Sequence, residues 1–165
     1  MTKAVSVGDH VKLIERQGRM TYFRVAEVWT EESDGEEIIF AKIEVLLGEN
    51  KGLDSWGPVK DLRWNGKVFV YDLRGMKYPE NLLLCFDMRE YAPWPIGPML
   101  TVEEAAEYMK VDLETIQRLI REDEIPAIEF CKDTNCKGKV LHIHNEAIDE
   151  YLRYVNAGYA KLDDR

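Results

Sequence analysis

A proline-rich segment divides the chain into two parts with different hydrophobic patterns. Residues 92–98 (Ala-Pro-Trp-Pro-Ile-Gly-Pro) contain three of the six prolines. Each proline fixes its own φ and pushes the preceding residue toward an extended conformation, so this segment predicts a stiff connector. Apolar residues occur in short β-rich runs before it and recur at helical spacing after it. We therefore expect two domains, residues 1–91 and 99–165, joined by a linker of residues 92–98.

The first part predicts a small β-barrel, which makes the whole chain an α+β protein. Short β-rich runs alternate with turn residues, and Asn65-Gly66 between two such runs is a strong hairpin signal. The predicted strands are His10–Glu15, Thr21–Trp29, Glu37–Leu47, Val59–Trp64, Lys67–Tyr71 and Leu82–Met88. Short strands must hide their edges, so we favour a closed barrel. Residues 7–13 resemble the first strand of SH3-like barrels.

The first part offers no recognisable catalytic or phosphate-binding motif, so we expect no enzyme. Its large aromatic residues allow two interpretations. They either fill a small core or line a groove that binds a peptide or a nucleic acid. These residues are Tyr22, Phe23, Trp29, Trp56 and Trp64. The acidic stretch of residues 31–37 is expected to be a solvated turn.

The second part begins with signals for two short helices joined by a tight turn. Thr101 and Glu104 form a capping-box pattern, and Asp112 is a good N-cap for the following helix. Apolar residues at helical spacing predict the buried sides. They are Val102, Ala105, Ala106 and Met109 in the first helix, and Leu113, Ile116, Leu119 and Ile120 in the second. This arrangement predicts a helix-turn-helix.

A hairpin and a last helix follow. Ile125-Pro126 ends the second helix, and residues 128–131 and 140–144 predict two strands in the place of a wing. Asn145 is expected to cap the last helix, which closes near Gly158. The apolar side of this helix is predicted to contain Ile148, Tyr151, Leu152 and Val155.

Residues from about 99 to about 155 resemble the excisionase-family DNA-binding domain, a small winged helix-turn-helix related to MerR-type regulators; the similarity begins with residues 99–127 and continues through the hairpin to residues 147–152. The resemblance depends on the register of Thr101, Glu104, Ala105, Thr115, Arg118, Ile125 and Pro126. It implies DNA binding in transcription control or in phage or plasmid recombination, with the second helix in the major groove. The sequence departs from the family at Asp123, where glycine is usual, and in a hairpin with less arginine. Aspartate tolerates a left-handed backbone better than most residues.

The second helix carries the predicted contacts with DNA bases. Arg118 is expected to bind guanine, and Glu114 is expected to accept a hydrogen bond from cytosine. The other predicted contacts with double-stranded DNA are Thr115, Gln117 and Arg121 on the helix and Lys132, Lys137 and Lys139 in the hairpin. A solvated helix would have the same pattern, because Arg118 lies four residues from both Glu114 and Glu122.

Cys131, Cys136, His142 and His144 form the metal-like cluster of the sequence. On a strand, His142 and His144 point to the same side, so these four residues could hold a structural zinc. The spacing matches no standard zinc motif, and unpaired thiols with solvated imidazoles are the alternative. No other cofactor is expected.

The chain carries 22 basic and 31 acidic residues, for a net charge of −9. Because this charge repels polyanions, DNA binding requires a local basic face. We predict a non-enzymatic, sequence-specific DNA-binding protein whose β domain mediates homo-oligomerisation or contact with a protein partner. The alternative is a protein-interaction adaptor whose helix-turn-helix does not contact DNA.

The sequence also predicts a cytoplasmic protein without membrane contact. No apolar run is long enough for a transmembrane helix, and the N-terminal residues do not form a secretory signal. Three cysteines, an odd number, fit a reducing compartment better than a disulfide framework.

Overall fold

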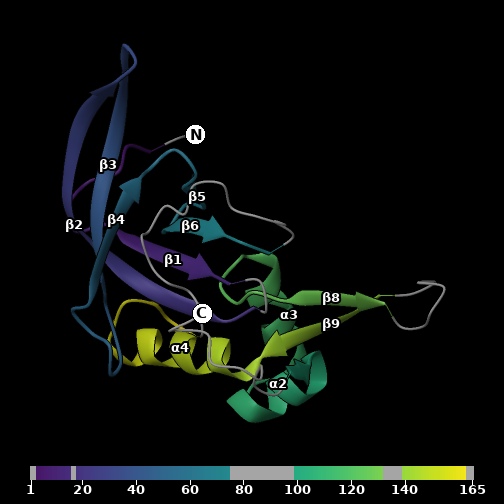
Figure 1. The fold of residues 1–165 in the computed structure, drawn as a ribbon. Coiled ribbons are helices and arrows are strands. Elements are labelled where there is room, and N and C mark those ends of the chain that lie inside the picture. Colours follow the sequence, from purple (N-terminus) through teal and green to yellow (C-terminus); the bar gives the residue numbers. More distant parts are fainter. Residues whose placement is uncertain (1–2, 16–17, 75–98, 132–138, 163–165) are drawn as a thin grey trace. The chain divides into compact units, whose positions relative to one another are not determined.

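The computed structural model describes residues 3–15, 18–74, 99–131 and 139–162 (Figure 1). The described residues form two compact units. The first unit takes its residues from 1–14 and 21–93, and the second from 15–20 and 94–165. The predicted linker of residues 92–98 lies outside the described residues, so the predicted domain boundaries stay a prediction.

A six-stranded sheet forms the first unit. Its strands are β1 (His10–Ile14), β2 (Met20–Ser33), β3 (Glu36–Val45), β4 (Asp54–Pro58), β5 (Arg63–Trp64) and β6 (Phe69–Asp72). Their order is β4-β3-β2-β1-β6-β5. Strand β1 pairs with β6 in parallel, whereas β2 with β3, β3 with β4, and β5 with β6 pair antiparallel.

Two tight turns of this sheet follow directly from their residues. Asp34 and Gly35 connect β2 to β3 with φ angles of 52° and 80°, which a two-residue hairpin of this type requires at both positions. The Asn65 side chain accepts hydrogen bonds from the amides of Lys67 and Val68, both at 2.9 Å, and so shapes the turn from β5 to β6. The hairpin predicted at Asn65-Gly66 is confirmed.

The predicted strands overlap β1, β2, β3 and β6, whereas β4 was not predicted. The solvated turn predicted at residues 31–37 is wrong in its extent: these residues are exposed, but β2 continues to Ser33 and β3 begins at Glu36, so only Asp34 and Gly35 form the turn. The predicted strand Val59–Trp64 is wrong in its first part, where a turn closed by a 3.0 Å hydrogen bond from the Leu62 amide to the Val59 carbonyl follows β4; only its last two residues form a strand, β5. The predicted strand Leu82–Met88 lies outside the described residues. The α+β class is confirmed, while closure of this sheet into an SH3-like barrel stays a prediction.

The second unit combines helices with a small sheet. Its elements are β7 (Met99–Thr101), α2 (Val102–Met109), α3 (Leu113–Arg121), β8 (Ile128–Cys131), β9 (Lys139–His144) and α4 (Asn145–Asn156). The sheet has the order β7-β9-β8, and both pairings are antiparallel. The hairpin predicted at 128–144 is thus confirmed in its strands, and its tip, residues 132–138, lies outside the described residues.

The core of the second unit confirms most of the predicted apolar sides. Its fully or nearly buried residues are Ala105, Ala106, Met109, Ile116, Leu119, Ile125, Ile143, Ala147, Ile148, Tyr151 and Tyr154. Leu113 was predicted to be buried, but it is 41% exposed because the burial of α3 begins one turn after its first residue. Asp123 has a φ of 63°, the left-handed conformation expected at this position.

The short segment between β1 and β2 belongs to the second unit. Glu15–Met20 is placed there, and residues 16 and 17 of this segment lie outside the described residues. Gly18 has a φ of 90°, and a Cβ at this position would lie 3.0 Å from a side-chain carbon of Ile128. The segment therefore passes close to β8, where a larger residue than glycine would meet both strain and crowding.

Candidate nucleic-acid interface

Helix α2 begins with a complete capping box. The Thr101 hydroxyl accepts a hydrogen bond from the Glu104 amide at 3.1 Å, and the Glu104 carboxylate accepts one from the Thr101 amide at 2.9 Å. These bonds satisfy two amide groups that the helix itself leaves unpaired, and they lower the pKa of Glu104. The cap predicted from the sequence is confirmed.

A tight turn then places α3 against α2. Lys110 takes the left-handed conformation with a φ of 59°, and the Val111 amide donates to the Ala106 carbonyl at 3.0 Å. Asp112 caps α3 by accepting from the Thr115 amide at 2.8 Å, and it also accepts from the Thr115 hydroxyl. Because Ala105 is small and fully buried, the two helices can approach closely.

The exposed side of α3 brings three of the predicted DNA-contacting residues together. Glu114, Gln117 and Arg121 are all exposed and are spaced three and four residues apart, so they share one face of the helix. Arg121 forms no ion pair within the described part of the chain. This face therefore offers a cation, an amide and a carboxylate to a partner.

Arg118 and Thr115, which were also predicted to contact DNA, are engaged elsewhere. Arg118 donates to the Glu122 carboxylate at 3.0 Å and to the Leu162 carbonyl at 2.9 Å, and its side chain is 25% exposed. The Thr115 hydroxyl is bonded to Asp112. Either residue would have to release these partners before it could bind a base.

The hairpin residues are only partly described. Lys132, Cys136 and Lys137 lie outside the described residues, and Lys139 and Cys131 are described only as backbone in β9 and β8. Their predicted contacts with phosphate or zinc stay predictions. No group of three or more metal-ligating side chains occurs among the residues that the structure describes.

His144 differs from its predicted, solvent-facing position. Its side chain is fully buried, because β9 is the central strand of its sheet and Gly18 lies beside the histidine on the neighbouring segment. His144 rather than the predicted Asn145 caps α4: its Nδ1 accepts from the Glu146 amide at 3.1 Å. Burial lowers the pKa of His144 and so favours the neutral ring that this cap requires.

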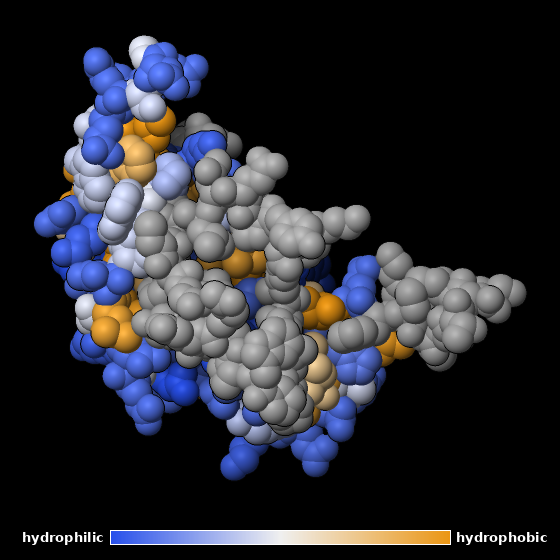
Figure 2. Space-filling view, viewed as in Figure 1, coloured by the Kyte–Doolittle hydropathy of each residue, from blue (hydrophilic) through white to orange (hydrophobic). Residues whose placement is uncertain are grey.

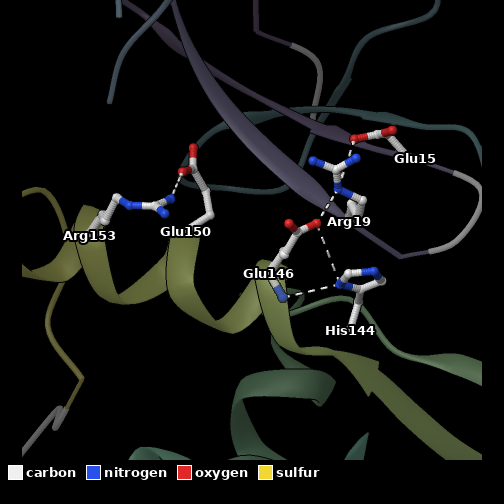
Figure 3. Close-up of polar contacts among 6 residues, drawn as sticks. All are labelled: Glu15, Arg19, His144, Glu146, Glu150 and Arg153. Carbon is white, nitrogen blue, oxygen red and sulfur yellow. Dashed lines mark hydrogen bonds and ion pairs between the residues drawn. The ribbon is translucent and has the colours of Figure 1, made fainter. Parts of the chain in front are cut away.

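A partly buried polar cluster next to this cap, made of Glu15, Arg19, His144 and Glu146, was missed by the sequence analysis. Figure 3 shows Arg19 between Glu15 and Glu146, with His144 beside Glu146. The Arg19 Nε lies 2.5 Å from the Glu146 carboxylate and 4.0 Å from that of Glu15. Further along α4, Arg153 pairs with the buried Glu150 at 2.8 Å. Arg19 thereby ties the Glu15–Met20 segment to the first turn of α4.

Some polar atoms of this cluster lack hydrogen-bond partners within the described structure. Glu15 Oε1, Arg19 Nη1 and His144 Nε2 are buried without a hydrogen-bond partner among the described groups. Burial raises the pKa of Glu15 to about 7, against the opposing effect of Arg19. Because Arg19 and Glu146 are far apart in sequence, no local sequence pattern predicts that they pair.

The comparisons with known proteins agree with this geometry. A family model described as a helix-turn-helix domain matches residues 99–153, a range that begins with β7 and extends into α4. No curated protein and no solved structure matches the chain. The match supports a helix-turn-helix domain of excisionase-like type, and this domain suggests a DNA-binding function of the regulatory or recombination kind.

In the described part of the chain, no helix has both the length and the apolar character needed to cross a membrane.

Proposed function

We propose that this chain is a non-enzymatic, sequence-specific DNA-binding protein that inserts α3 into the major groove. The observation that carries the proposal is the exposed face of Glu114, Gln117 and Arg121 on a capped second helix within a helix-turn-helix domain. Gln117 suits adenine, Glu114 suits the amino group of cytosine, and Arg121 suits guanine or a phosphate.

The remaining predicted residues add to this interface. Lys132, Lys137 and Lys139 of the hairpin supply phosphate contacts, in the manner of a wing in MerR-like proteins. Arg118 joins the interface when DNA displaces both Glu122 and the Leu162 carbonyl; the ion pair with Glu122, four residues away, contributes only about 0.2–0.5 kcal/mol. Arg118→Ala is then expected to relax base preference, whereas Lys137→Ala weakens binding to all sequences alike.

The first unit serves protein contact or homo-oligomerisation in this proposal. A single small DNA-binding module has a limited footprint, so useful specificity calls for two copies or a neighbouring protein on the DNA. Action in transcription control or in recombination is compatible with either arrangement.

Selection from a random pool of double-stranded oligonucleotides tests the proposal. We expect the full chain to enrich a defined motif and to lose retention steeply between about 50 mM and about 200 mM salt. Enrichment of no motif, together with no retained DNA at low salt, would refute it.

A second candidate function is a protein-interaction adaptor that retains the helix-turn-helix fold without contacting DNA. The observation that favours it is the acidic surface of α2, where Glu103, Glu104 and Glu107 are all exposed. The pairing of Arg118 with Glu122 points the same way, because it neutralises a cation of α3. The low-salt retention experiment separates the two candidates.

A further inference from the structure

Three aromatic rings gather on the face of the first sheet that points away from its core. Trp29 of β2 stacks on Phe40 of β3 with ring centroids 5.9 Å apart, and Trp56 of β4 lies 6.0 Å from Phe40 and 6.5 Å from Trp29. The side chain of Trp56 is one of the large exposed apolar groups, at 49%. We call these three residues the aromatic cluster.

The register of the strands separates this cluster from the core. Trp29 is paired with Phe40, and the next pair along the ladder is Val28 with Ala41. Ala41 belongs to the buried core and Val28 packs against it, so neighbouring positions on each strand face opposite sides. Trp64, by contrast, packs against the core and contacts Phe69 with centroids 5.0 Å apart. Of the two interpretations left open by the sequence, filling the core applies to Trp64, whereas a binding surface stays open for Trp29 and Trp56.

The surroundings of the aromatic cluster are strongly acidic. Residues 31–37, at the tip of the β2–β3 hairpin, contain five acidic residues and no basic one, and all are exposed. This tip is covered by hydrophilic side chains at the top of the space-filling view (Figure 2). Glu31 lies two residues beyond Trp29, and Glu36 four residues before Phe40, so both carboxylates share the face of the cluster.

Two cations on the strands of this face, Arg24 and Lys42, are paired with carboxylates. Arg24 donates to Glu44 at 3.0 Å, and Lys42 lies 3.5 Å from Asp54. The carboxylates toward the hairpin tip therefore leave the face negative, and this charge selects against nucleic acid and for a cationic partner.

We propose that the outer face of β2, β3 and β4 binds a basic segment of a partner protein. Arginine or lysine side chains of that segment stack on Trp29 and Trp56 through cation–π contacts, while the carboxylates of the hairpin tip hold the neighbouring charges. A symmetric contact with a second copy would bring like charges together, which disfavours it. The inference rests on the protein-contact role proposed for the first unit and names the chemistry of the partner.

A random-peptide array probed with the full chain tests this inference. We expect the bound peptides to be enriched in arginine and lysine relative to the array. For a peptide chosen from them and measured in solution, Trp56→Ala lowers the affinity by about thirtyfold, as expected for a tryptophan at the centre of an interface. Joint Glu31→Gln and Glu36→Gln substitution lowers it severalfold and weakens its dependence on salt.

Matched variants separate this effect from a general loss of structure. Val7→Ala removes another exposed apolar side chain of the same unit, and Glu49→Gln removes another exposed carboxylate; both leave the affinity unchanged. Trp56→Lys provides a second test at the same position, because it removes the ring and reverses the local charge. It abolishes binding if the inference holds.

Three results would overturn the inference. They are the absence of basic enrichment, peptide binding by Trp56→Ala and Trp56→Lys that equals that of the wild type, and binding of a single-stranded oligonucleotide that depends on Trp56. Retention of double-stranded DNA is measured on the same variants. If peptide binding alone is lost, the proposed DNA-binding function is not contradicted. If DNA retention alone is lost, the proposed binding of a basic segment by the aromatic cluster is not contradicted.

Discussion

The exposed side of α3 and the outer face of the first sheet offer different chemistry to a partner. Helix α3 presents Glu114, Gln117 and Arg121, a mixed set suited to base edges and phosphates. The sheet presents Trp29 and Trp56 among carboxylates, a set that attracts cations. The net charge of −9 is the sum over the whole chain and does not describe either surface by itself. The local charges argue against DNA contact by the sheet more strongly than against contact by α3.

The largest expected effect comes from a substitution beneath the surface of α3. Ile116 is fully buried, so Ile116→Ala should lower the free energy of unfolding of the second unit by about 2–5 kcal/mol through lost burial and a cavity. Ile39→Ala is the control, because Ile39 is 47% exposed in the first unit and should change stability by less than about 0.5 kcal/mol. Chemical denaturation measures both values, and similar losses in the two variants would contradict the described packing.

The next prediction concerns how stability depends on pH through Glu15, which belongs to the polar cluster around Arg19. Burial raises the pKa of Glu15 from its ordinary 4.5 to about 7, so between these two pH values the folded chain holds a proton that the unfolded chain has released. The stability contributed by Glu15 is present below about pH 4.5 and is lost as the pH rises through 7. Glu15→Gln removes this loss, so the variant should gain on the order of 2–3 kcal/mol over the wild type between about pH 4.5 and about pH 8.

Other groups that titrate in this pH range can be separated from the effect of Glu15. The lowered pKa of His144 acts in the opposite direction, but it is common to both proteins and cancels in the difference. Glu49→Gln, at an exposed site of the first unit, should show no gain over the same range. A difference between Glu15→Gln and wild type that does not change with pH would show that Glu15 titrates normally.

Arg121→Ala tests the surface of α3 itself. We expect its affinity for the selected DNA to fall about tenfold, because one charge-assisted contact is lost. Lys51→Ala removes the same charge from an exposed position of the first unit and should leave the affinity nearly unchanged. Electrophoretic mobility shift at a fixed salt concentration compares the two, and equal losses would indicate that only net charge matters.

The smallest effect is expected at the cap of α2. Thr101→Ala removes the hydroxyl that accepts from Glu104 and should cost about 1 kcal/mol of stability. Thr30→Ala, at an exposed position of β2, retains every cap and should cost less. Thermal unfolding followed by circular dichroism measures the difference, and an unchanged Thr101→Ala variant would contradict the role of this cap.

The two units also differ in how well the sequence predicts them. The caps of α2 and α3 were predicted because each depends on residues three positions apart, Thr101 with Glu104 and Asp112 with Thr115. The turn at Asp34-Gly35 is equally local, since its backbone angles follow from the residues themselves. Such features need no knowledge of the rest of the fold.

Features that depend on distant residues were not predicted. The burial of His144 depends on Gly18, and the pairing of Arg19 depends on Glu146, across more than a hundred residues in each case. Alternation along β2 and β3 indicates that each strand has two faces. Only the complete sheet shows that Trp29 lies on the face opposite the core. The engagement of Arg118 by the Leu162 carbonyl likewise requires the last helix to be in place.

Retention of double-stranded DNA by the full chain, at about 50 mM and about 200 mM salt, tests the division of roles between the two surfaces most directly. We predict that the wild type and Trp56→Lys bind equally well at low salt, that Arg121→Ala binds more weakly, and that all lose retention at the higher salt. The account would be contradicted if the wild type retained no DNA at low salt, or if Trp56→Lys rather than Arg121→Ala changed the retention.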